Sequence, residues 1–250
     1  MNCSVSVVTV CYNEIDTISR CVQSVIGQKN ADIQYVVMDG CSTDGTADLL
    51  REYGDSIDHL VIEADDGIYS AMNKALEYCS GDIVYFLNAD DYFYSNDTVE
   101  KAVKEFADDS SLKILSGRVK FFNVPLRDGK PYVRTDFSYQ NKLELYRSPV
   151  PQQCTFVKRS LFQTYGGFNE RYKMCADYDW LIRMLSQDIK VRHVDNYFCY
   201  FDYTGISYTQ NKKRKREKNL IVLFNSSFYE LLVYGFLGVS NILREKLVGR

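Results

Sequence analysis

Acidic side chains stand directly after three of the most apolar stretches in the N-terminal part of the chain. The apolar run Ile83–Leu87 is followed by Asp90 and Asp91, an earlier run ends at Asp39, and the first run is followed closely by Glu14. Such runs are typical of buried parallel strands, and open α/β sheets place their ligands at the carboxyl ends of these strands. Adjacent carboxylates offer the oxygen ligands that a hard divalent cation prefers. For any one site alone, an ordinary acidic turn is the alternative.

A regular alternation of strand and helix patterns would position these acids. The patterns predict strands over residues 4–10, 33–38, 59–63 and 83–87, separated by helices over about 17–26, 46–53 and 68–78. We expect Asp16 to cap the first of these helices. Alternation of this kind implies a parallel sheet with right-handed crossovers. On such a sheet the three acidic strand ends gather at one edge, which favours a functional cluster over three unrelated turns.

Composition places the chain among ordinary globular proteins. It has 250 residues, of which 46% are hydrophobic and 25% charged, enough for one large domain or a domain with an appendage. A net charge of −3 gives nucleic-acid binding no global electrostatic support. The eight cysteines form no C-x-x-C pair, and with two histidines they offer no zinc-site spacing. Because no signal peptide precedes the first strand, we expect free thiols in the cytoplasm.

The phosphate-binding loops of the common nucleotide folds are missing from the sequence. Neither G-x-G-x-x-G nor G-x-x-x-x-G-K-[ST] occurs. A nucleotide-like ligand at this sheet edge would therefore need its phosphate charge neutralised by a metal ion and a few side chains.

Four segments resemble, in order and spacing, the nucleotide-sugar domain of family 2 glycosyltransferases. They read SVVTVCYNE, VVMDGCSTDGT, EADDGIYSAMNKA and YFLNADD, between about residues 4 and 92, and later segments extend the resemblance to about four fifths of the chain. The resemblance implies an α/β protein of the GT-A fold, with a mixed, mostly parallel central sheet flanked by helices. It also implies transfer of a sugar from a nucleotide diphosphate sugar to an acceptor hydroxyl.

The resemblance assigns the nucleoside pocket residue by residue. It implies that Thr9, Asn13 and Glu14 line the pocket and that Asp39 accepts a hydrogen bond from the base. Asp65 would lie in the loop that approaches the base and the ribose. The context of Asp39 is similar to that of uridine binders and favours UDP, although an aspartate can also accept from guanine.

The diphosphate contacts and the metal site are implied in the same way. Asn73 and Lys74 would lie near the diphosphate or the sugar. The triplet Asn88-Ala89-Asp90 occupies the position of the family's D-x-D motif, which makes Asp90 the direct ligand of Mg²⁺ or Mn²⁺. The chain departs from the family pattern at Asn88, where Asp is usual, but an amide oxygen can accept from the ribose or from a metal-bound water. Asp91 is expected to support the loop.

The resemblance places the general base at Asp177, in the segment CADYDWLIR. A carboxylate there would take the proton from the acceptor hydroxyl, and a single base without a nucleophilic partner implies direct displacement with inversion at C1. A helix N-cap is the structural alternative for the same residue. Gln153 matches the second residue of a His-Gln pair in a subgroup of the family and would bind the acceptor or the diphosphate, or brace a loop. Gln152 replaces the histidine.

The C-terminal part of the chain has a different character. We expect a catalytic domain over residues 1–207, with a nucleotide-binding half (1–92) and an acceptor half (93–207), followed by a basic, amphipathic helical extension over 208–250. In the extension a basic run at 212–218 precedes an apolar, aromatic segment that polar residues interrupt, so it would be a poor membrane span. It suits a membrane surface through 212–247, and helices packed on the domain are the alternative.

Similar enzymes act on saccharide or lipid-linked saccharide acceptors in surface polysaccharide synthesis. The resemblance therefore implies a cytoplasmic protein at the inner face of the cell membrane. Two rival classes stay open. A nucleotidyltransferase would be expected to carry a Gly-rich loop after the first strand, where this chain has Cys11–Glu14. A non-catalytic nucleotide-sugar-binding module would keep the pocket and lose the base, and Asp177 in register argues against it.

Overall fold

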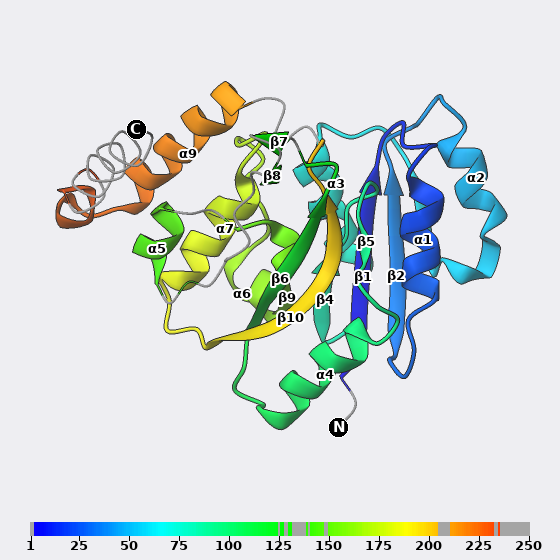
Figure 1. Cartoon of the computed structure of the whole chain (residues 1–250), viewed down its shortest axis with the longest axis horizontal. Helices are drawn as coiled ribbons and strands as arrows, with labels where there is room; N and C mark the ends of the chain where they lie inside the picture. Colours follow the sequence, from blue (N-terminus) through cyan, green and yellow to red (C-terminus); the bar gives the residue numbers. More distant parts are fainter. Residues whose placement is uncertain are drawn as a thin grey trace.

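A curled eight-stranded sheet, with the strand order β3-β2-β1-β4-β9-β6-β10-β5, runs through the described part of the protein (Figure 1). The computed structural model describes residues 3–124, 126–127, 130–131, 139, 141–147, 150–204, 211–232 and 235. The strands of the large sheet are β1 (Val5–Cys11), β2 (Ile33–Asp39), β3 (His59–Ile62), β4 (Ile83–Phe86), β5 (Tyr92–Phe93), β6 (Ile114–Phe122), β9 (Thr155–Lys158) and β10 (Val191–Asp202). A separate small hairpin pairs β7 (Leu126–Arg127) with β8 (Lys130–Pro131).

The N-terminal half is the predicted alternation of strands and helices. Strands β3, β2, β1 and β4 are parallel. They are joined through α1 (Ile18–Ile26), α2 (Thr46–Glu52), the short 3-10 turn η1 (Gly54–Ser56) and α3 (Ile68–Tyr78). All of β1 is buried, as expected for a parallel strand covered on both faces. Right-handed crossovers put α1 and α2 on one face and α3 on the other, because the chain reverses direction across the sheet after β3.

The strand order reverses between β1 and β4, which are neighbours although two strands separate them in sequence. Their register pairs Val5 with Ile83 and Val8 with Phe86. The backbone N–H of Leu87 then donates to the carbonyl of Val8 at 2.9 Å. Reversal points of this kind open a crevice at the carboxyl ends of the two strands. The loops that follow β1 and β4 therefore flank one crevice.

The second half is antiparallel in part, which makes the sheet mixed. Strand β9 runs antiparallel to both β4 and β6, whereas β10 runs parallel to β6 and antiparallel to β5. The helical elements here are α4 (Thr98–Asp108), α5 (Lys142–Arg147), the 3-10 turn η2 (Gln152–Cys154), α6 (Ser160–Tyr165) and α7 (Ala176–Leu185).

Apolar patterns in the second half of the sequence predict strands over 112–115 and 117–122, and over 191–194 and 197–201, but each pair is a single long strand in the structure. The predicted breaks near Gly117 and near Asn196 both lie inside continuous strands, β6 and β10. Gly117 does not interrupt β6; a Cβ at that position would lie 2.5 Å from the ring of Phe198, so the glycine makes room for a core side chain of β10. The second break is a register irregularity between His193 and Tyr197, not a turn.

The predicted N-cap of α1 is wrong, because the N-cap is Thr17 rather than Asp16. The sequence also predicts Ser160 as the N-cap of the helix that ends at Tyr165, but Ser160 lies inside α6, whose N-cap is Arg159. The chain enters α1 through a turn in which the amide of Thr17 donates to the carbonyl of Glu14, so the helix begins one residue later. The boundaries of α3 agree with the prediction.

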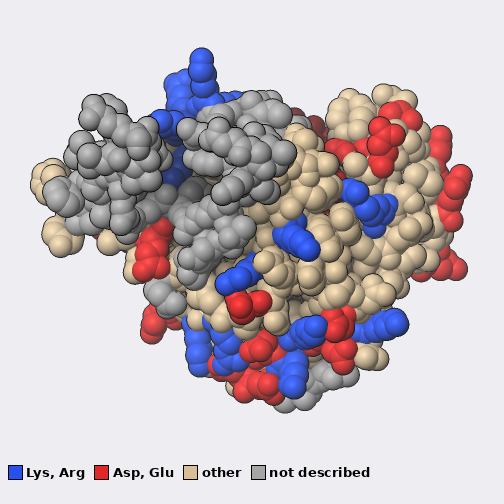
Figure 2. Space-filling model, viewed as in Figure 1, with Lys and Arg blue, Asp and Glu red and all other residues tan. Residues whose placement is uncertain are grey.

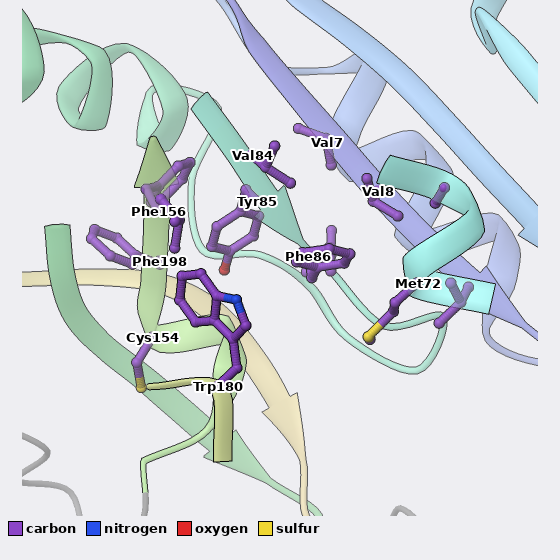
Figure 3. Close-up of a cluster of buried hydrophobic side chains, with 14 of the residues drawn as sticks. Val7, Val8, Met72, Val84, Tyr85, Phe86, Cys154, Phe156, Trp180 and Phe198 are labelled. Carbon is purple, nitrogen blue, oxygen red and sulfur yellow. The ribbon is translucent and has the colours of Figure 1, made fainter. Parts of the chain in front are cut away.

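Aromatic side chains fill the core beneath β4 (Figure 3). The ring of Tyr85 stacks on Phe156 with centroids 4.1 Å apart and on Phe93 at 5.2 Å, and Phe198 meets it edge-on. Trp180 of α7 belongs to a second aromatic group around Phe86: its ring stacks on Phe162 with centroids 4.5 Å apart, and Phe162 meets Phe86 edge-on. The eight cysteines are all free, and most are buried like small hydrophobic residues.

Helix α9 (Asn211–Asn225) carries the whole basic run 212–218 and packs on the body of the protein. Ile221 and Val222 are buried at its inner face. After the helix, the carboxylate of Glu230 pairs with the ammonium of Lys142 at 2.8 Å, and the carbonyl of Asn225 accepts from the Tyr146 hydroxyl at 3.1 Å. No helix among the described residues is long and apolar enough to cross a membrane.

Candidate active site

Carboxylates from three strand ends gather at the crevice between β1 and β4. Glu14 follows β1, Asp90 and Asp91 follow β4, and Asp202 ends β10. Burial and the neighbouring charge of Glu14 raise the pKa of Asp90 to about 6. Burial, Asp44 and Asp202 also raise the pKa of Glu14, against the hydrogen bond from Thr17. Asp202 was not expected from the sequence, because it lies more than a hundred residues after Asp90 along the chain.

Asp91 holds the loop after β4 to the end of β10. One of its carboxylate oxygens accepts the backbone N–H of Asp202 at 2.9 Å, and the other is buried without a described partner. Burial and the charge of Asp90 raise the pKa of Asp91 well above its usual range. These contacts fit the supporting part expected for Asp91.

Arg20 of α1 supports the same loop from the other side and was not expected from the sequence. Its guanidinium donates to the carbonyl of Asp90 at 3.1 Å. It lies over the rings of Tyr92 and Phe122, at 4.4 and 5.0 Å from their centroids. These contacts are cation–π contacts that hold a positive charge beside the acidic loop.

The residues after β4 fit a divalent cation that a diphosphate helps to bind. In the described part of the chain, no three or more His, Cys, Asp or Glu side chains are arranged to hold a metal ion by themselves. However, the side-chain oxygen of Asn88 is buried with no hydrogen-bond partner, two residues before Asp90. Mg²⁺ in nucleotide enzymes is typically bound by one or two protein oxygens and completed by phosphates and water. Asp90 and Asn88 supply a donor set of that size.

The ends of β1, β2 and β3 approach one another beside this crevice. A Cβ on Gly40 would lie 2.9 Å from the carboxylate of Asp65 and 3.3 Å from the ring of Tyr12, so a larger residue at this position would require the Asp65 side chain to move. Asp65 also accepts the backbone N–H of Gly67 at 2.7 Å. The ring of Tyr12, which the sequence analysis did not single out, is 61% exposed here.

Asp39 and Asn13 organise the turn after β2. The carboxylate of Asp39 is buried and accepts both the backbone N–H and the hydroxyl of Ser42, at 2.8 and 2.6 Å. Asn13 has a positive φ of 55° and accepts the backbone N–H of Thr43 at 2.9 Å through its side-chain oxygen. The Asp39 oxygen that accepts from the Ser42 amide and the Asn13 oxygen each keep a second lone pair that a ligand can use. The other Asp39 oxygen also accepts from the thiol of Cys11 at 3.4 Å.

Thr9 does not line the nucleoside pocket that the resemblance implies. Its side chain is fully buried, and its hydroxyl accepts from the hydroxyl of Tyr35 at 3.1 Å inside the core. The alternation of side chains along β1 turns Thr9 toward the core side, away from the loop residues.

Asn73 and Lys74 make structural contacts in the described conformation. The amide of Asn73 donates to the carbonyl of Phe168 at 2.9 Å and accepts its backbone N–H at 2.8 Å, which ties α3 to the loop before α7. The ammonium of Lys74 pairs with Glu63 at 2.8 Å. Because Lys74 is on the surface, its ammonium can exchange this partner for a ligand phosphate, whereas the Asn73 amide is fully engaged.

Asp177 lies at the second position of α7, partly buried, and its N-cap alternative does not hold. The N-cap of α7 is Cys175. The hydroxyl of Tyr69, on α3, donates to the Asp177 carboxylate at 2.7 Å. Burial raises the pKa of Asp177, and the Tyr69 hydrogen bond and the amides at the helix start oppose this shift. The carboxylate of Asp177 is therefore held between α3 and α7.

A small, mostly apolar cavity adjoins Asp177. Its lining includes Phe86 of β4 and Trp180 of α7, and Asp177 is the single ionisable group among the described residues that line it. Gln152 also lines the cavity, whereas Gln153 is buried and its carbonyl accepts from the Tyr85 hydroxyl at 2.7 Å. Gln153 therefore fits the loop-bracing alternative, whereas the 3-10 turn η2 places Gln152 at the cavity.

Comparison with known proteins gives this arrangement a family. The family model for glycosyl transferase family 2 matches residues 6–166. An uncharacterised glycosyltransferase of Mycobacterium tuberculosis is 30% identical over 207 residues, covering 81% of this chain and 76% of the relative. A glycosyltransferase of PGL/p-HBAD biosynthesis from Mycobacterium bovis is 27% identical, covering 82% and 79%. The putative teichuronic acid biosynthesis glycosyltransferase TuaG of Bacillus subtilis is 37% identical over 51% of this chain and 50% of its own length.

Solved structures show the same fold at low identity. S. aureus TarS in complex with UDP-GlcNAc superposes with a TM-score of 0.71 at 20% identity, covering 88% of this chain and 66% of that one. The mannosyltransferase PcManGT of Pyrobaculum calidifontis, in complex with GDP-Man and Mn²⁺, superposes with a TM-score of 0.65 at 22% identity, covering 87% and 62%. The fold is that of GT-A glycosyltransferases, and the chain belongs to glycosyl transferase family 2.

Proposed function

We propose that this glycosyltransferase inverts the configuration at C1 of a UDP-linked sugar as it transfers the sugar to an acceptor hydroxyl, with Asp177 as general base. The observation that carries the proposal is the position of Asp177: a hydrogen-bonded carboxylate facing a cavity whose described lining holds no second ionisable group. A base without an enzyme nucleophile beside it favours attack by the acceptor itself, and a single displacement inverts the anomeric centre.

The environment of Asp177 suits proton abstraction near neutral pH. A carboxylate in water is too weak a base for an alcohol, and burial that raises its pKa strengthens it. The Tyr69 hydroxyl holds the carboxylate in one direction and keeps its ionised form accessible. Trp180 and Phe86 line the cavity beside Asp177, and the acceptor hydroxyl would enter beside them.

The donor nucleoside would lie over the ends of β1, β2 and β3. Tyr12 offers an exposed ring for stacking on the base, and the buried Asp39 offers carboxylate lone pairs to base N–H donors. Asn13, Glu14 and Asp65 would approach the ribose and the base. The UDP-GlcNAc bound by TarS supports UDP, whereas PcManGT binds GDP-Man, so the choice of nucleotide rests on the context of Asp39.

Asp90 would bind Mg²⁺ or Mn²⁺, with the oxygen of Asn88 directed at the ribose or at the metal's water shell. The bound cation supplies charge neutralisation for the leaving diphosphate. The protein's own part is to hold the Asp90 loop in place, which Arg20 does through the Asp90 carbonyl and Asp91 through the end of β10. The ammonium of Lys74, which pairs with Glu63 in this structure, would approach the diphosphate.

The acceptor would be a saccharide on a lipid carrier, brought to the enzyme at the inner face of the cell membrane. Helix α9 supports this setting: Lys212, Lys215 and Arg216 line one groove with Leu220 and Leu223. Beyond the groove, the side chains of Phe224, Phe228 and Tyr229 are 72–79% exposed. Figure 2 shows basic groups projecting at the margin where α9 begins in Figure 1. Bases beside exposed aromatic groups suit an anionic lipid surface.

The first prediction concerns the base. Asp177→Asn keeps an oxygen that can accept from Tyr69 but cannot take a proton, so kcat should fall by about 10²- to 10⁴-fold. Release of nucleoside diphosphate from a panel of nucleotide sugars with Mn²⁺ measures this and identifies the donor. Donor binding and thermal stability should be unchanged, and the exposed variant Asp188→Asn should behave like the wild type. Full turnover by Asp177→Asn would remove Asp177 from the mechanism.

The second prediction concerns pH. The Tyr69 hydroxyl stabilises the ionised carboxylate, so Tyr69→Phe should raise the pKa of Asp177 further. Because the base acts when deprotonated, the acid limb of the kcat/KM profile should move to higher pH, with activity lost at low pH and retained at high pH. Tyr78→Phe, at an exposed position of the same helix, is the matched control. An unshifted acid limb would contradict the proposed base.

The third prediction concerns the metal. Asp90→Ala should weaken UDP binding in the presence of Mn²⁺ by at least about tenfold, because a direct ligand is lost. Calorimetric titration of UDP with Mn²⁺, and again with EDTA, measures the difference. In EDTA the variant and the wild type should bind alike. The exposed variant Asp55→Ala serves as control, and Mn²⁺-dependent binding that survives in Asp90→Ala would show that the metal lies elsewhere.

The fourth prediction concerns the membrane surface. The triple variant Lys212→Gln/Lys215→Gln/Arg216→Gln should bind vesicles containing anionic phospholipid more weakly, by about 1 kcal/mol for each base removed. Co-sedimentation with anionic and with zwitterionic vesicles tests this, and raised salt should release the wild type. Lys104→Gln, on α4 away from α9, is the control. Equal sedimentation of wild type and triple variant would argue for a soluble acceptor.

A further inference from the structure

The three residues that lead into α7 are held from outside by α9. The carboxylate of Glu217 accepts the backbone N–H of Lys173 at 3.0 Å and that of Met174 at 2.8 Å, one on each oxygen. The thiol of Cys175 lies 3.6 Å from the carbonyl of Arg214, to which it donates. Cys175 is the N-cap of α7, yet its side chain makes no capping bond. The start of α7 is therefore anchored by a helix that lies some forty residues later in the chain.

Helix α9 is itself fixed to the body of the protein. Ile221 and Val222, one turn after Glu217, are 0% and 1% exposed. The amide of Asn225 lies 3.4 Å from the carboxylate of Asp179 on α7. Because α9 is anchored in this way, the carboxylate of Glu217 can restrain the backbone amides that it binds.

Glu217 is the single acid in the basic run 212–218. From sequence alone, an acid among so many bases is expected to pair with a neighbour one turn away on the helix surface. In the structure it turns inward, and each oxygen takes one backbone amide. Hydrogen bonds from amides to an ionised carboxylate are shorter and stronger than neutral ones, so the contact is suited to fixing the turn.

The turn 173–175, which Glu217 holds, leads directly to Asp177. Asp177 follows Cys175 by two residues, inside the first turn of α7, and its carboxylate meets the Tyr69 hydroxyl at 2.7 Å from the opposite side. The ammonium of Lys173 donates to the carbonyl of Asp66 at 3.0 Å, which links the same turn to the loop between β3 and α3. A displacement of about 1 Å in a group that must meet a reacting atom can cost about 10²-fold in rate.

We propose that Glu217 is a positioning residue for the general base: its carboxylate fixes the turn 173–175 and thereby the direction of the Asp177 carboxylate. Glu217 does not line the cavity beside Asp177, so it acts through the backbone and touches no reacting atom. The inference rests on the proposed role of Asp177 as base.

Two substitutions and a matched control test the proposal. Glu217→Ala removes both acceptors, and kcat for release of nucleoside diphosphate from the preferred UDP-sugar should fall by about 10- to 100-fold. KM for the UDP-sugar should stay within about twofold, since the donor site is untouched. Glu217→Gln keeps one acceptor oxygen and should lose less. Lys213→Gln, an exposed position on the same helix, should match the wild type.

Hydrogen exchange gives a readout that does not depend on the reaction. The amides of Lys173 and Met174 should exchange faster in Glu217→Ala than in the wild type, with the thermal midpoint little changed. The proposal is overturned if kcat and these exchange rates stay at wild-type values, or if kcat, KM and thermal stability all deteriorate together in both variants. Failure of the base assignment is distinguishable: Asp177→Asn would then turn over fully, which overturns this inference as well, whereas an inactive Asp177→Asn beside a fully active Glu217→Ala overturns this inference alone.

Discussion

The parallel pairing of β1 with β4 determines where the candidate donor contacts can lie. The register from Val5–Ile83 to Val8–Phe86 brings the two strands out side by side, at the point where the strand order reverses. A slip of one residue would exchange the two faces of a strand and carry the loop residues with it. Such a slip is opposed from both sides, because β1 and β4 are buried along their full length. Glu14 and Asp90 can therefore share one crevice although 75 positions separate them in the sequence.

The crevice that this pairing creates is electrostatically incomplete without a cation. Burial and repulsion from neighbouring carboxylates, Asp202 among them, raise the pKa of Glu14, Asp90 and Asp91. A diphosphate alone would add negative charge to a region that already disfavours it, whereas a divalent cation would favour the ionised carboxylates and offset the phosphates. The orphaned oxygen of Asn88 adds a neutral donor at the same place without adding a further charge. An amide in the first position of this triplet is thus compatible with a cation site in a cluster already rich in acids.

Local patterns predicted most of the fold, and tertiary contacts explain the exceptions. The apolar spacing of Ile68–Tyr78 and the strand–helix alternation of the first four strands were enough to predict these elements, because the spacing of apolar residues within each element determines its buried face. The break predicted near Gly117 failed because a glycine there serves the packing of Phe198, which comes from a strand far along the chain. Thr9 illustrates the same limit within the site. Its position in a motif suggested a ligand contact, but the direction of a strand side chain depends on which neighbours bury it, and both faces of β1 are covered.

The surroundings of Asp177, the proposed general base, show that a sequence motif can locate a carboxylate without revealing the residues that position it. Asp177 can be found from its own segment, whereas Tyr69, Gln152 and Glu217 come from three other parts of the chain and share no local pattern with it. Two opposite influences act on the pKa of a buried carboxylate at the start of a helix: the free backbone amides lower it, and burial raises it. A small displacement of the helix start changes both influences at once. A catalytic group in this position therefore needs its preceding turn to be held by an independent element, and a C-terminal helix that packs across the turn supplies that restraint.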